Sequence, residues 1–495
     1  MLMSYSQLAA MPASAPPELD MPWFLRFLLP SLLALAAGAA CSRQPDARAA
    51  SATPPTAPST SPGKETPAQK ASRMDWWTDA RFGLFIHWGL YAVPAGEWQG
   101  RRGYGEWIME EADIPKAEYE RLAARFNPVK YDPDAWARAA KDAGMKYVIL
   151  TSKHHEGFAM WDTQGTDYNI ARRTPYGKSV IEPLAEAVRR QGLHFGVYYS
   201  IMDWHDPSQR ESKPGTLSPT LIDPEQKARY VRDMKTELKE LVERADVEVL
   251  WFDGEWVDWW TQEDARDLDA FLRGLKPDII INNRIYNSRE GMAGISPAGM
   301  PGDFHTPEQE VPATGLGADS YWESCMTMNQ KWGFVNDSEA DWKSTGVLLR
   351  HLIDSASKGG NFLLNVGPTA EGEFPQRALQ RMAGIGRWMR INGEAIHGTS
   401  ATPLGLLHGQ APAWGRITRK PAEGGAAERL YLHVFDWPRD NVLRLPLAQE
   451  VSSARLLAAP DARIGIDQGD GELRLRLPAA APDPEVSVVR LDLSP

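Results

Sequence analysis

Short, fully apolar runs alternate with longer amphipathic segments between about residue 80 and residue 370. The clearest run, residues 249–252, consists of Val, Leu, Trp and Phe and stops abruptly at Asp253-Gly254. Runs of this kind are typical of strands buried on both faces, as in parallel sheets that are covered by helices. The alternation therefore predicts repeated strand–helix units, with Asp253 at the C-terminal end of a strand.

Seven runs have the character of strands, and five segments between them have the character of helices. We expect strands at residues 82–89, 147–151, 195–200, 249–253, 279–284, 321–325 and 361–367, and helices at residues 133–143, 181–191, 224–244, 264–274 and 344–357. Seven or eight such units over about 320 residues favour a closed (β/α)8-like barrel over an open sheet. Because only seven strands are recognisable, we expect the remaining one to be irregular or hidden in the sequence pattern.

The pattern changes near residue 398. Beyond it, short alternating runs are separated by turn residues, for example at residues 430–434 and 442–445, and no helical periodicity remains. This pattern predicts a small antiparallel β-sandwich. The catalytic barrel is therefore predicted to span residues 72–398 and the sandwich residues 399–495.

The N-terminal region has a composition unlike that of the rest of the chain. Residues 1–41 are predicted to be an export signal, because Arg26 precedes an apolar run, residues 27–40, that is too short to span a bilayer. The Gly-Ala-Ala-Cys ending resembles a bacterial lipoprotein cleavage site with Cys41 as the lipidated residue. Ordinary secretion to the periplasm with Ala-x-Ala-like cleavage is the alternative. Residues 42–71, rich in Ala, Pro, Ser and Thr, are predicted to be a disordered linker.

The composition excludes some classes of function. The net charge of −11 argues against a nucleic-acid-binding protein. Only two cysteines occur, Cys41 and Cys325, so a disulfide framework is excluded and Cys325 is expected to be buried and unreactive. The 19 tryptophans are many, and several follow strand-like runs, as Trp256 does. We therefore expect aromatic platforms that bind a ligand.

Polar side chains gather where the predicted strands end. They are His87, His154, His155, Asp253, Arg284 and Glu323. Histidines and an aspartate could hold a metal for hydrolysis, so a barrel metallohydrolase is one hypothesis. Alternatively, histidines could bind sugar hydroxyls while two carboxyl groups cleave a glycosidic bond. The adjacent His154 and His155 point in different directions, which suits a polyhydroxylated ligand better than one metal. A non-catalytic glycan-binding surface protein is the third hypothesis.

Four segments carry a specific resemblance. They are Phe-Gly-Leu-Phe-Ile-His-Trp-Gly at residues 82–89, Lys-His-His-Glu-Gly-Phe at 153–158, Trp-Phe-Asp-Gly at 251–254 and Leu-Leu-Asn-Val-Gly-Pro at 363–368. Together they make residues 72–400 resemble the α-L-fucosidases of glycoside hydrolase family twenty-nine. The resemblance implies a retaining exo-glycosidase with a catalytic barrel and a C-terminal β-sandwich. It implies no metal and no cofactor, and a fucosylated oligosaccharide as the substrate.

The resemblance also implies roles for individual residues. Asp253 is similar to the nucleophile of the family. The positions similar to those that line its fucose pocket are His87, Glu106, Trp107, His154, His155, Tyr198, Trp251 and Arg284. Arg284 is expected to keep Asp253 ionised.

The general acid/base is assigned less directly. Glu308, in the stretch Thr-Pro-Glu-Gln of a long loop, is the first choice because such a loop can reach the leaving-group oxygen. Glu323 is the second choice, and its alternative interpretation is a carboxylate that orients pocket residues. Glu255 is expected to be a loop residue. Glu156 is expected to support the pocket residues or the fold. The Thr-Pro-Glu-Gln stretch resembles the subgroup that prefers 1,3- or 1,4-linked fucose.

Overall fold

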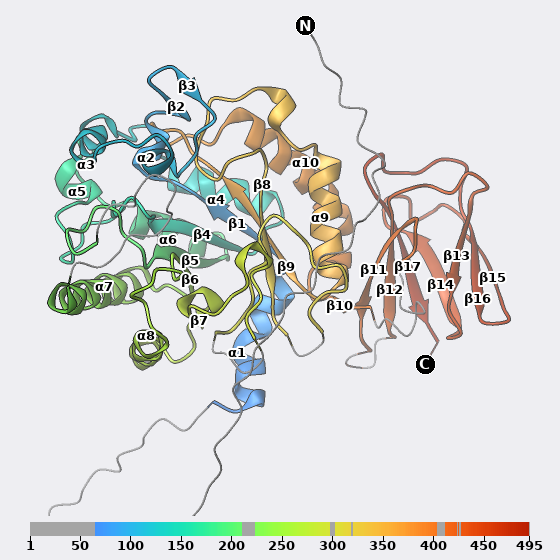
Figure 1. Cartoon of the computed structure of the whole chain (residues 1–495). Coiled ribbons are helices and arrows are strands. Elements are labelled where there is room, and N and C mark those ends of the chain that lie inside the picture. The colour runs from blue at the N-terminus through green and yellow to red at the C-terminus, as the bar shows by residue number, and fades with distance from the viewer. Residues whose placement is uncertain are drawn as a thin grey trace, which may run out of the picture. The chain divides into compact units, whose positions relative to one another are not determined.

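The fold is described from a computed structural model of the chain (Figure 1). It describes residues 65–209, 223–297, 302–317, 320–402, 411–422, 424 and 427–494. The predicted export signal, Cys41 and most of the predicted linker lie outside these residues. Within the described parts of the chain, no helix combines the length and the apolar character that crossing a membrane requires.

A curved parallel sheet of seven strands forms the centre of the larger domain. Its order is β7-β6-β5-β4-β1-β9-β8, and all neighbouring pairs are parallel. The strands are β1 (Phe82–Ile86), β4 (Tyr147–Lys153), β5 (His194–Ser200), β6 (Val249–Asp253), β7 (Ile280–Ile281), β8 (Glu323–Thr327) and β9 (Asn361–Val366). These are the seven strands that the apolar runs predict, and nearly all of their residues are buried.

An irregular segment, residues 303–309, closes the gap between the edge strands β7 and β8. On one side, Asn283 N donates to Phe304 O at 2.9 Å. On the other side, Glu323 N donates to His305 O at 2.9 Å, and Gln309 N donates to Cys325 O at 2.9 Å. Isolated parallel bridges join this segment to both neighbours. The segment therefore takes the place of the eighth strand, and the predicted (β/α)8-like barrel is confirmed.

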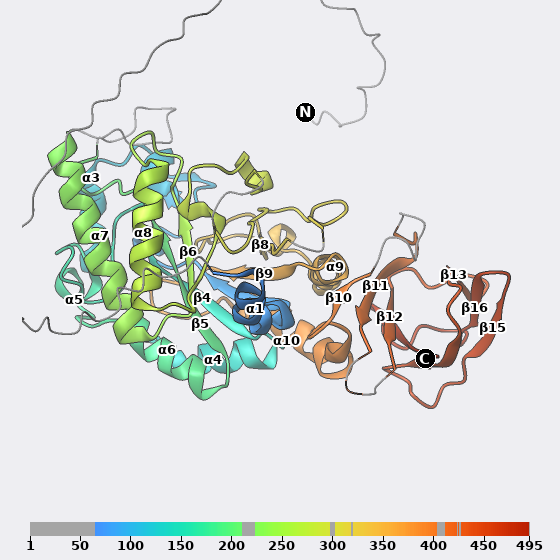
Figure 2. The same cartoon turned by 90° about the horizontal axis from the view of Figure 1, so that it is seen from below.

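Helices cover the outside of the barrel (Figures 1 and 2). The long ones are α4 (Pro133–Asp142), α6 (Ile181–Arg190), α7 (Pro224–Ala245), α8 (Gln262–Leu275), α9 (Thr345–Ser357) and α10 (Gln376–Asn392). The sequence predicts all of these except α10. Short helices α2 (Ile108–Glu111), α3 (Lys116–Tyr119) and α5 (Ile170–Arg173), with the hairpin of β2 (Glu97–Trp98) and β3 (Arg101–Arg102), lie in the loops that follow β1 and β4.

Helix α1 (Pro67–Ala80) closes the end of the barrel opposite the C-terminal strand ends, and Figure 2 shows it near the centre of the strands. Its Met74 and Trp77 are buried in the barrel interior together with side chains of the strands. The predicted linker is therefore too long, because the helix begins before residue 71. Thr66 and Gln69 form a capping box across Pro67, and this cap starts a helix whose first five residues, 67–71, resemble a linker in composition.

The C-terminal part is a two-sheet β-sandwich, as predicted. One sheet has the order β10-β11-β12-β17-β14 and the other β13-β16-β15. Their strands are β10 (Ser400–Ala401), β11 (Gly415–Lys420), β12 (Arg429–Val434), β13 (Val442–Pro446), β14 (Val451–Leu456), β15 (Gly465–Gly469), β16 (Glu472–Arg476) and β17 (Ser487–Leu493). Leucine and valine side chains fill the space between the sheets. Trp388 Nε1 of α10 donates to Val486 O at 2.8 Å, which links barrel and sandwich.

Candidate active site

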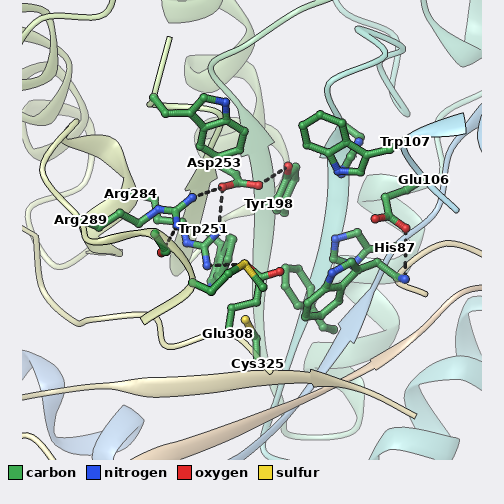
Figure 3. Close-up of a pocket in the computed structure, with 16 residues that line it drawn as sticks. His87, Glu106, Trp107, Tyr198, Trp251, Asp253, Arg284, Arg289, Glu308 and Cys325 are labelled. Atoms are coloured by element: carbon green, nitrogen blue, oxygen red, sulfur yellow. Dashed lines mark hydrogen bonds and ion pairs between the residues drawn. The ribbon is translucent and has the colours of Figure 1, made fainter. Parts of the chain in front are cut away.

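A cavity of about 440 Å³ opens at the C-terminal ends of the barrel strands. Active sites of barrels of this type lie at this end, because the loops that follow the strands meet there. Figure 3 shows side chains from many different strands pointing toward one another around it. The cavity is lined by Phe85, His87, Glu106, Trp107, His154, Tyr198, Trp251, Asp253, Trp256, Arg284, Arg289, Gly291, Met292, Glu308, Cys325 and Trp332.

Asp253 ends β6, and its carboxylate reaches the cavity. Oδ1 accepts a hydrogen bond from Arg284 Nη1 at 2.8 Å, and Oδ2 accepts one from the hydroxyl of Tyr198 at 3.0 Å. His155 Nε2 and Arg289 Nη2 both lie 3.6 Å from the carboxylate. Burial alone would raise the pKa of Asp253, but these neighbours, Arg284 above all, lower it to about 2. Asp253 is therefore an ionised carboxylate inside an otherwise largely apolar cavity.

Arg284 connects two carboxylates of the cavity, those of Asp253 and Glu308. Its Nη1 binds Asp253, and its Nη2 donates to Glu308 Oε2, also at 2.8 Å (Figure 3). The guanidinium is fixed further by Nε, which donates to Thr306 Oγ1 at 2.8 Å, and by Trp251, whose ring centroid lies 4.5 Å from Cζ. Because one planar group holds both carboxylates, Asp253 and Glu308 face the same part of the cavity.

Glu308 lies on the irregular eighth segment of the barrel. Its backbone N–H donates to Met292 O at 2.8 Å, and an isolated bridge joins it to Cys325 of β8. The side chain is 15% exposed. The bond to Arg284 uses Oε2, so Oε1 is free of that contact. This position agrees with a carboxyl group that reaches a bound ligand from the loop side.

Glu323, the second choice for the acid, lies elsewhere. It is the first residue of β8, whereas the cavity lies at the opposite ends of the strands, and it is not part of the cavity lining. Its Oε1 accepts from Trp251 Nε1 at 3.0 Å, and its Oε2 from the hydroxyl of Tyr147. Burial raises its pKa to about 7. Glu323 thus orients Trp251 from below the cavity, and the geometry favours Glu308 as the acid.

The three histidines have different positions. His87 lines the cavity, and its Nδ1 contacts Asn365 Oδ1 at 2.7 Å. Since Asn365 Nδ2 donates to Trp332 O at 2.7 Å, its Oδ1 must accept from His87, which leaves Nε2 of His87 as an acceptor. Burial lowers the pKa of His87 to about 3. His154 also lines the cavity, and its pKa lies well below its usual value because of burial. Both imidazoles are therefore neutral, so each has one nitrogen that donates and one that can accept a hydrogen bond from a hydroxyl group.

His155, which the resemblance also places in the pocket, is not among the residues that line the cavity. Its ring packs against that of His154, with ring centroids 4.3 Å apart. Its Nδ1 contacts Ser200 Oγ at 2.6 Å, and its Nε2 faces the carboxylate of Asp253 at 3.6 Å. Burial lowers its pKa to about 4. His155 therefore lies beside Asp253 and between the rings of Trp107 and Trp256, at centroid distances of 5.0 and 5.6 Å.

Glu106 and Trp107 reach the cavity from the loop after β1. Glu106 Oε2 accepts from the backbone N–H groups of Trp332 and Gly333 at 3.1 and 3.0 Å, and burial raises the pKa of Glu106. Trp107 lies parallel to Trp256, with ring centroids 6.4 Å apart. Two flat indole faces therefore line the side of the cavity near Asp253.

Several lining residues were not among the predicted site residues. Phe85, Arg289, Gly291, Met292 and Trp332 belong to this group, and Trp256 was noted only as an aromatic platform. Phe85 lies inside an apolar strand, and the others lie on loops whose paths no local pattern predicts. Cys325 also lines the cavity, although burial holds the pKa of its thiol well above its usual value and keeps it protonated, in agreement with the expected low reactivity.

The residues do not favour a metal site. Among the residues that the structure describes, no group of three or more His, Cys, Asp and Glu side chains could hold a metal ion. Asp253 and Glu308 both contact Arg284, and this guanidinium would repel a cation at the place where they converge. The arrangement instead combines an ionised carboxylate, a second carboxyl group, neutral imidazoles and aromatic faces. This set of groups is suited to hydrolysis of a glycosidic bond.

The model of the α-L-fucosidase family matches residues 50–394. The chain belongs to the α-L-fucosidase family. It is thus a glycoside hydrolase, and the family resemblance inferred from the four sequence segments is confirmed.

Solved fucosidase structures are similar over most of the chain. An α-L-fucosidase isoenzyme from Paenibacillus thiaminolyticus is 37% identical, with a TM-score of 0.73. The match covers 86% of this chain and 100% of the Paenibacillus chain. A family GH29 α-L-fucosidase from Bacteroides thetaiotaomicron is 30% identical, with a TM-score of 0.74, over 87% of this chain and 97% of that chain. The α-L-fucosidase of Dictyostelium discoideum is 29% identical over 84% of this chain and 92% of its own length.

Proposed function

We propose that this fucosidase is a retaining exo-enzyme that removes terminal α-L-fucose from fucosylated oligosaccharides or glycoconjugates. The observation that carries the proposal is the pair of carboxyl groups, Asp253 and Glu308, held by Arg284 at one cavity wall. In a retaining glycosidase one such group is the nucleophile and the other the acid and base. The Bacteroides thetaiotaomicron fucosidase was trapped as a covalent intermediate with 2-fluoro-fucosyl fluoride, by use of a glutamate-to-glutamine variant.

Asp253 is the nucleophile of this proposal. One of its oxygens attacks the anomeric carbon, the bond from that carbon to the leaving oxygen breaks, and a β-fucosyl ester forms. The attack requires an ionised carboxylate, and the low pKa of Asp253, about 2, supplies one at any physiological pH. As the ester forms, negative charge leaves Asp253, and in the second step it returns there. Arg284 and Tyr198 stabilise the charge in both states of the cycle.

Glu308 is the general acid and base. It protonates the leaving oxygen in the first step, and in the second step it takes a proton from the water that attacks the ester. Its Oε2 contacts Arg284, so the transferred proton belongs on Oε1. Because Glu308 and Asp253 contact neighbouring nitrogens of one guanidinium, both can reach the same anomeric centre.

The remaining lining residues fit a single fucose. Neutral His87 and His154 and the carboxyl group of Glu106 exchange hydrogen bonds with hydroxyl groups, because each can accept or donate in a defined direction. Phe85, Trp251 and Trp332 provide apolar surface for the methyl group. A pocket for one terminal sugar favours an exo-acting enzyme.

The linkage preference remains a proposal that rests on one stretch of sequence. Thr306-Pro307-Glu308-Gln309 is similar to the subgroup that accepts branched substrates, so we propose 1,3- or 1,4-linked fucose. A panel of fucosylated oligosaccharides of defined linkage tests this directly. Faster release from 1,2- or 1,6-linked substrates would contradict it.

We also propose that the fucosidase is exported to the periplasm or to the outer membrane as a lipoprotein. The support is the apolar run before Cys41 and the small residues next to it. If Cys41 carries lipid, Cys41→Ala releases the enzyme from the membrane fraction into the soluble fraction. A mature protein that retains its first 41 residues in the cytoplasm would contradict export.

Covalent trapping tests the proposed mechanism. The Glu308→Gln variant is incubated with 2-fluoro-fucosyl fluoride and digested, and the labelled peptide is identified by mass spectrometry. We expect one fluorofucosyl group on Asp253 and none on the matched Asp253→Asn variant. A label on another carboxylate, or an equally labelled Asp253→Asn variant, would remove Asp253 from the role of nucleophile.

A further inference from the structure

A second arginine, Arg289, lies beside Asp253 in addition to Arg284. It is on the loop after β7, lines the cavity, and its side chain is only 10% exposed. Its Nη2 lies 3.6 Å from Asp253 Oδ1, and its Cζ lies 5.2 Å from the ring centroid of Trp256. Nε donates to Glu255 Oε1, and Nη1 donates to Gly291 O. The guanidinium is therefore fixed on three sides while its remaining nitrogen faces the nucleophile.

Glu255 is placed to hold Arg289. It is 1% exposed and separated from Asp253 only by Gly254. Gly254 has φ of +77°, and a Cβ there would lie 2.8 Å from both Cβ and N of Met202, so only glycine permits this turn. The turn sends Glu255 away from the cavity and toward Arg289. Burying a carboxylate is unfavourable unless it is paired, and Arg289 is the charged group that Glu255 contacts.

The loop that carries Arg289 is attached to the segment that carries Glu308. Met292 O accepts from Glu308 N at 2.8 Å, and Gly294 O accepts from Thr306 N at 3.1 Å. A Cβ at Gly294 would lie 1.9 Å from Thr306 O, so the two segments are in direct contact. Arg289 thus lies between the end of β6 and the eighth segment. Backbone contacts of its loop, as well as its own side-chain contacts, fix its position.

Arg284 and Arg289 differ in the second carboxylate that each contacts besides Asp253. Arg284 contacts both Asp253 and Glu308, and the charge of Glu308 changes when it gives up and regains its proton. Arg289 contacts Asp253 and Glu255, and Glu255 takes no part in the proposed proton transfers. Burial raises the pKa of Glu255 to about 7, but its proton does not pass to the substrate, so Arg289 can keep Asp253 in one orientation throughout the cycle.

We propose that Glu255 and Arg289 form a positioning pair for Asp253, in which Glu255 holds the guanidinium of Arg289 beside Oδ1 so that the carboxylate stays turned toward the anomeric carbon. The inference rests on the proposed role of Asp253 as nucleophile. Both residues act through Asp253 and are positioning residues. Arg284, Tyr198 and His155 contact the same carboxylate from other elements, so loss of Arg289 weakens its placement without abolishing it.

The rate of covalent trapping measures this placement. 2-Fluoro-fucosyl fluoride carries a leaving group that needs no proton, so its reaction isolates attack by Asp253 from acid catalysis by Glu308. For Arg289→Met we expect the limiting labelling rate to fall about 10- to 100-fold, while the half-saturating reagent concentration changes by less than about threefold. Glu255→Ala is expected to reproduce this loss, because Arg289 then has no buried partner.

Further variants test whether Glu255 and Arg289 act as one unit. Glu255→Gln keeps an oxygen that can accept from Nε of Arg289, so its loss is expected to be clearly smaller than that of Glu255→Ala. The double variant Arg289→Met/Glu255→Ala is expected to be no slower than Arg289→Met alone, within about twofold, as for two residues that act as one unit. Arg350→Met is the matched control, since Arg350 also contacts an aromatic ring and a carboxylate, Phe435 and Asp436, but at the sandwich.

Each other outcome contradicts the proposal. A normal labelling rate in Arg289→Met, or a change only in the half-saturating concentration, would make Arg289 a neighbour or a substrate-binding residue. A normal rate in Glu255→Ala would remove Glu255 from the pair. If Arg289→Met fails to fold, Arg289→Lys retains the charge but not the fork, and its limiting rate must fall between those of wild type and Glu255→Ala. A label on a residue other than Asp253 would overturn the proposed function itself, which the labelled peptide distinguishes.

Discussion

The two ends of the barrel each contain an aspartate surrounded by cations, and they use it differently. At the closed end, next to α1, Asp303 accepts two hydrogen bonds from Arg73 at 2.8 Å, one from Arg273 at 3.1 Å and one from the backbone N–H of Ile281 at 2.8 Å. At the cavity end, Asp253 accepts one from Arg284 and one from Tyr198. Asp303 is 3% exposed and Asp253 12%.

The difference lies in the unused bonding capacity of the carboxylate. An ionised carboxylate can accept about four hydrogen bonds, and Asp303 accepts that many while Asp253 accepts two. The pKa values of both are lowered, in each case because arginines outweigh the effect of burial. A saturated carboxylate stabilises the fold, whereas one with free lone pairs toward a cavity can form a new bond. The comparison predicts that loss of Asp253 impairs catalysis and that loss of Asp303 impairs stability.

The largest effect is expected at Asp253. We expect Asp253→Gly to lower the activity by about three orders of magnitude or more, while the protein stays folded because Arg284 and Arg289 keep Glu308 and Glu255 as partners. Azide can occupy the emptied space and attack an aryl fucoside directly, which gives β-fucosyl azide. Activity measurements and product analysis check both points. Near-normal turnover of a folded variant would contradict the assignment of Asp253.

The second effect concerns Glu308. For Glu308→Ala we expect substrates with poor leaving groups to react about 10²- to 10³-fold more slowly, because the leaving oxygen is no longer protonated. An aryl fucoside with a good leaving group still forms the ester, and azide then attacks the ester from the opposite face and gives α-fucosyl azide. The anomeric configuration of the azide thus separates this variant from Asp253→Gly. Rescue in Glu323→Ala, and none in Glu308→Ala, would move the acid to Glu323.

At the closed end, we expect Asp303→Asn to lower the free energy of unfolding by about 2–4 kcal/mol, because Arg73 and Arg273 lose a buried counter-ion. The value of kcat/KM is expected to stay within about twofold. Since folding lowers the pKa of Asp303, its contribution is complete above its unfolded value near 3.9 and is lost as pH falls below about 4. Urea unfolding at several pH values measures this. Asp440→Asn, which removes an exposed partner of Arg444, is the control and should leave the free energy of unfolding nearly unchanged.

The smallest expected effect concerns Glu156. Its contribution to stability changes with pH in the direction opposite to that of Asp303 at the closed end. Glu156, buried at the cavity end, accepts from Leu90 N at 2.9 Å, and burial raises its pKa to about 8. A raised carboxyl pKa means that the folded protein binds a proton that the unfolded chain has lost, so stability falls as pH rises from about 5 to about 8. We expect Glu156→Gln to remove roughly 1–3 kcal/mol of this decline. An unchanged slope in urea unfolding would show that Glu156 is ionised in the folded protein.

The regular parts of the fold could be predicted because each strand is buried on both faces and therefore apolar throughout. The strand that ends at Asp253 and the helix α7 illustrate this, since their bounds agree with the sequence pattern within a residue or two. The helix α1 was missed because its composition resembles that of a linker, and its stability comes from the Thr66 cap and from Trp77 packing inside the barrel. Tertiary contacts of this kind leave no periodic signal.

The residues of the candidate site also fall into two groups, those that the sequence pattern predicts and those that it does not. Residues next to strand ends, such as His87 and Arg284, could be placed because strand ends converge at one face of a barrel. Arg289 and Trp332 could not, because each reaches the cavity from a loop whose path depends on backbone contacts with distant segments. His154 and His155 were both placed by the family resemblance, and in the structure their rings pack together, with centroids 4.3 Å apart.

The irregular eighth segment also has an evolutionary consequence. It joins its neighbours through isolated bridges instead of a continuous ladder, so residues can be inserted or lost around it without shifting the register of the regular strands. The residues proposed to bind fucose lie mainly on or next to those strands, while Glu308 lies on the irregular segment. Descendants of this enzyme can therefore acquire new preferences for the group that carries fucose while they keep the same specificity for fucose itself.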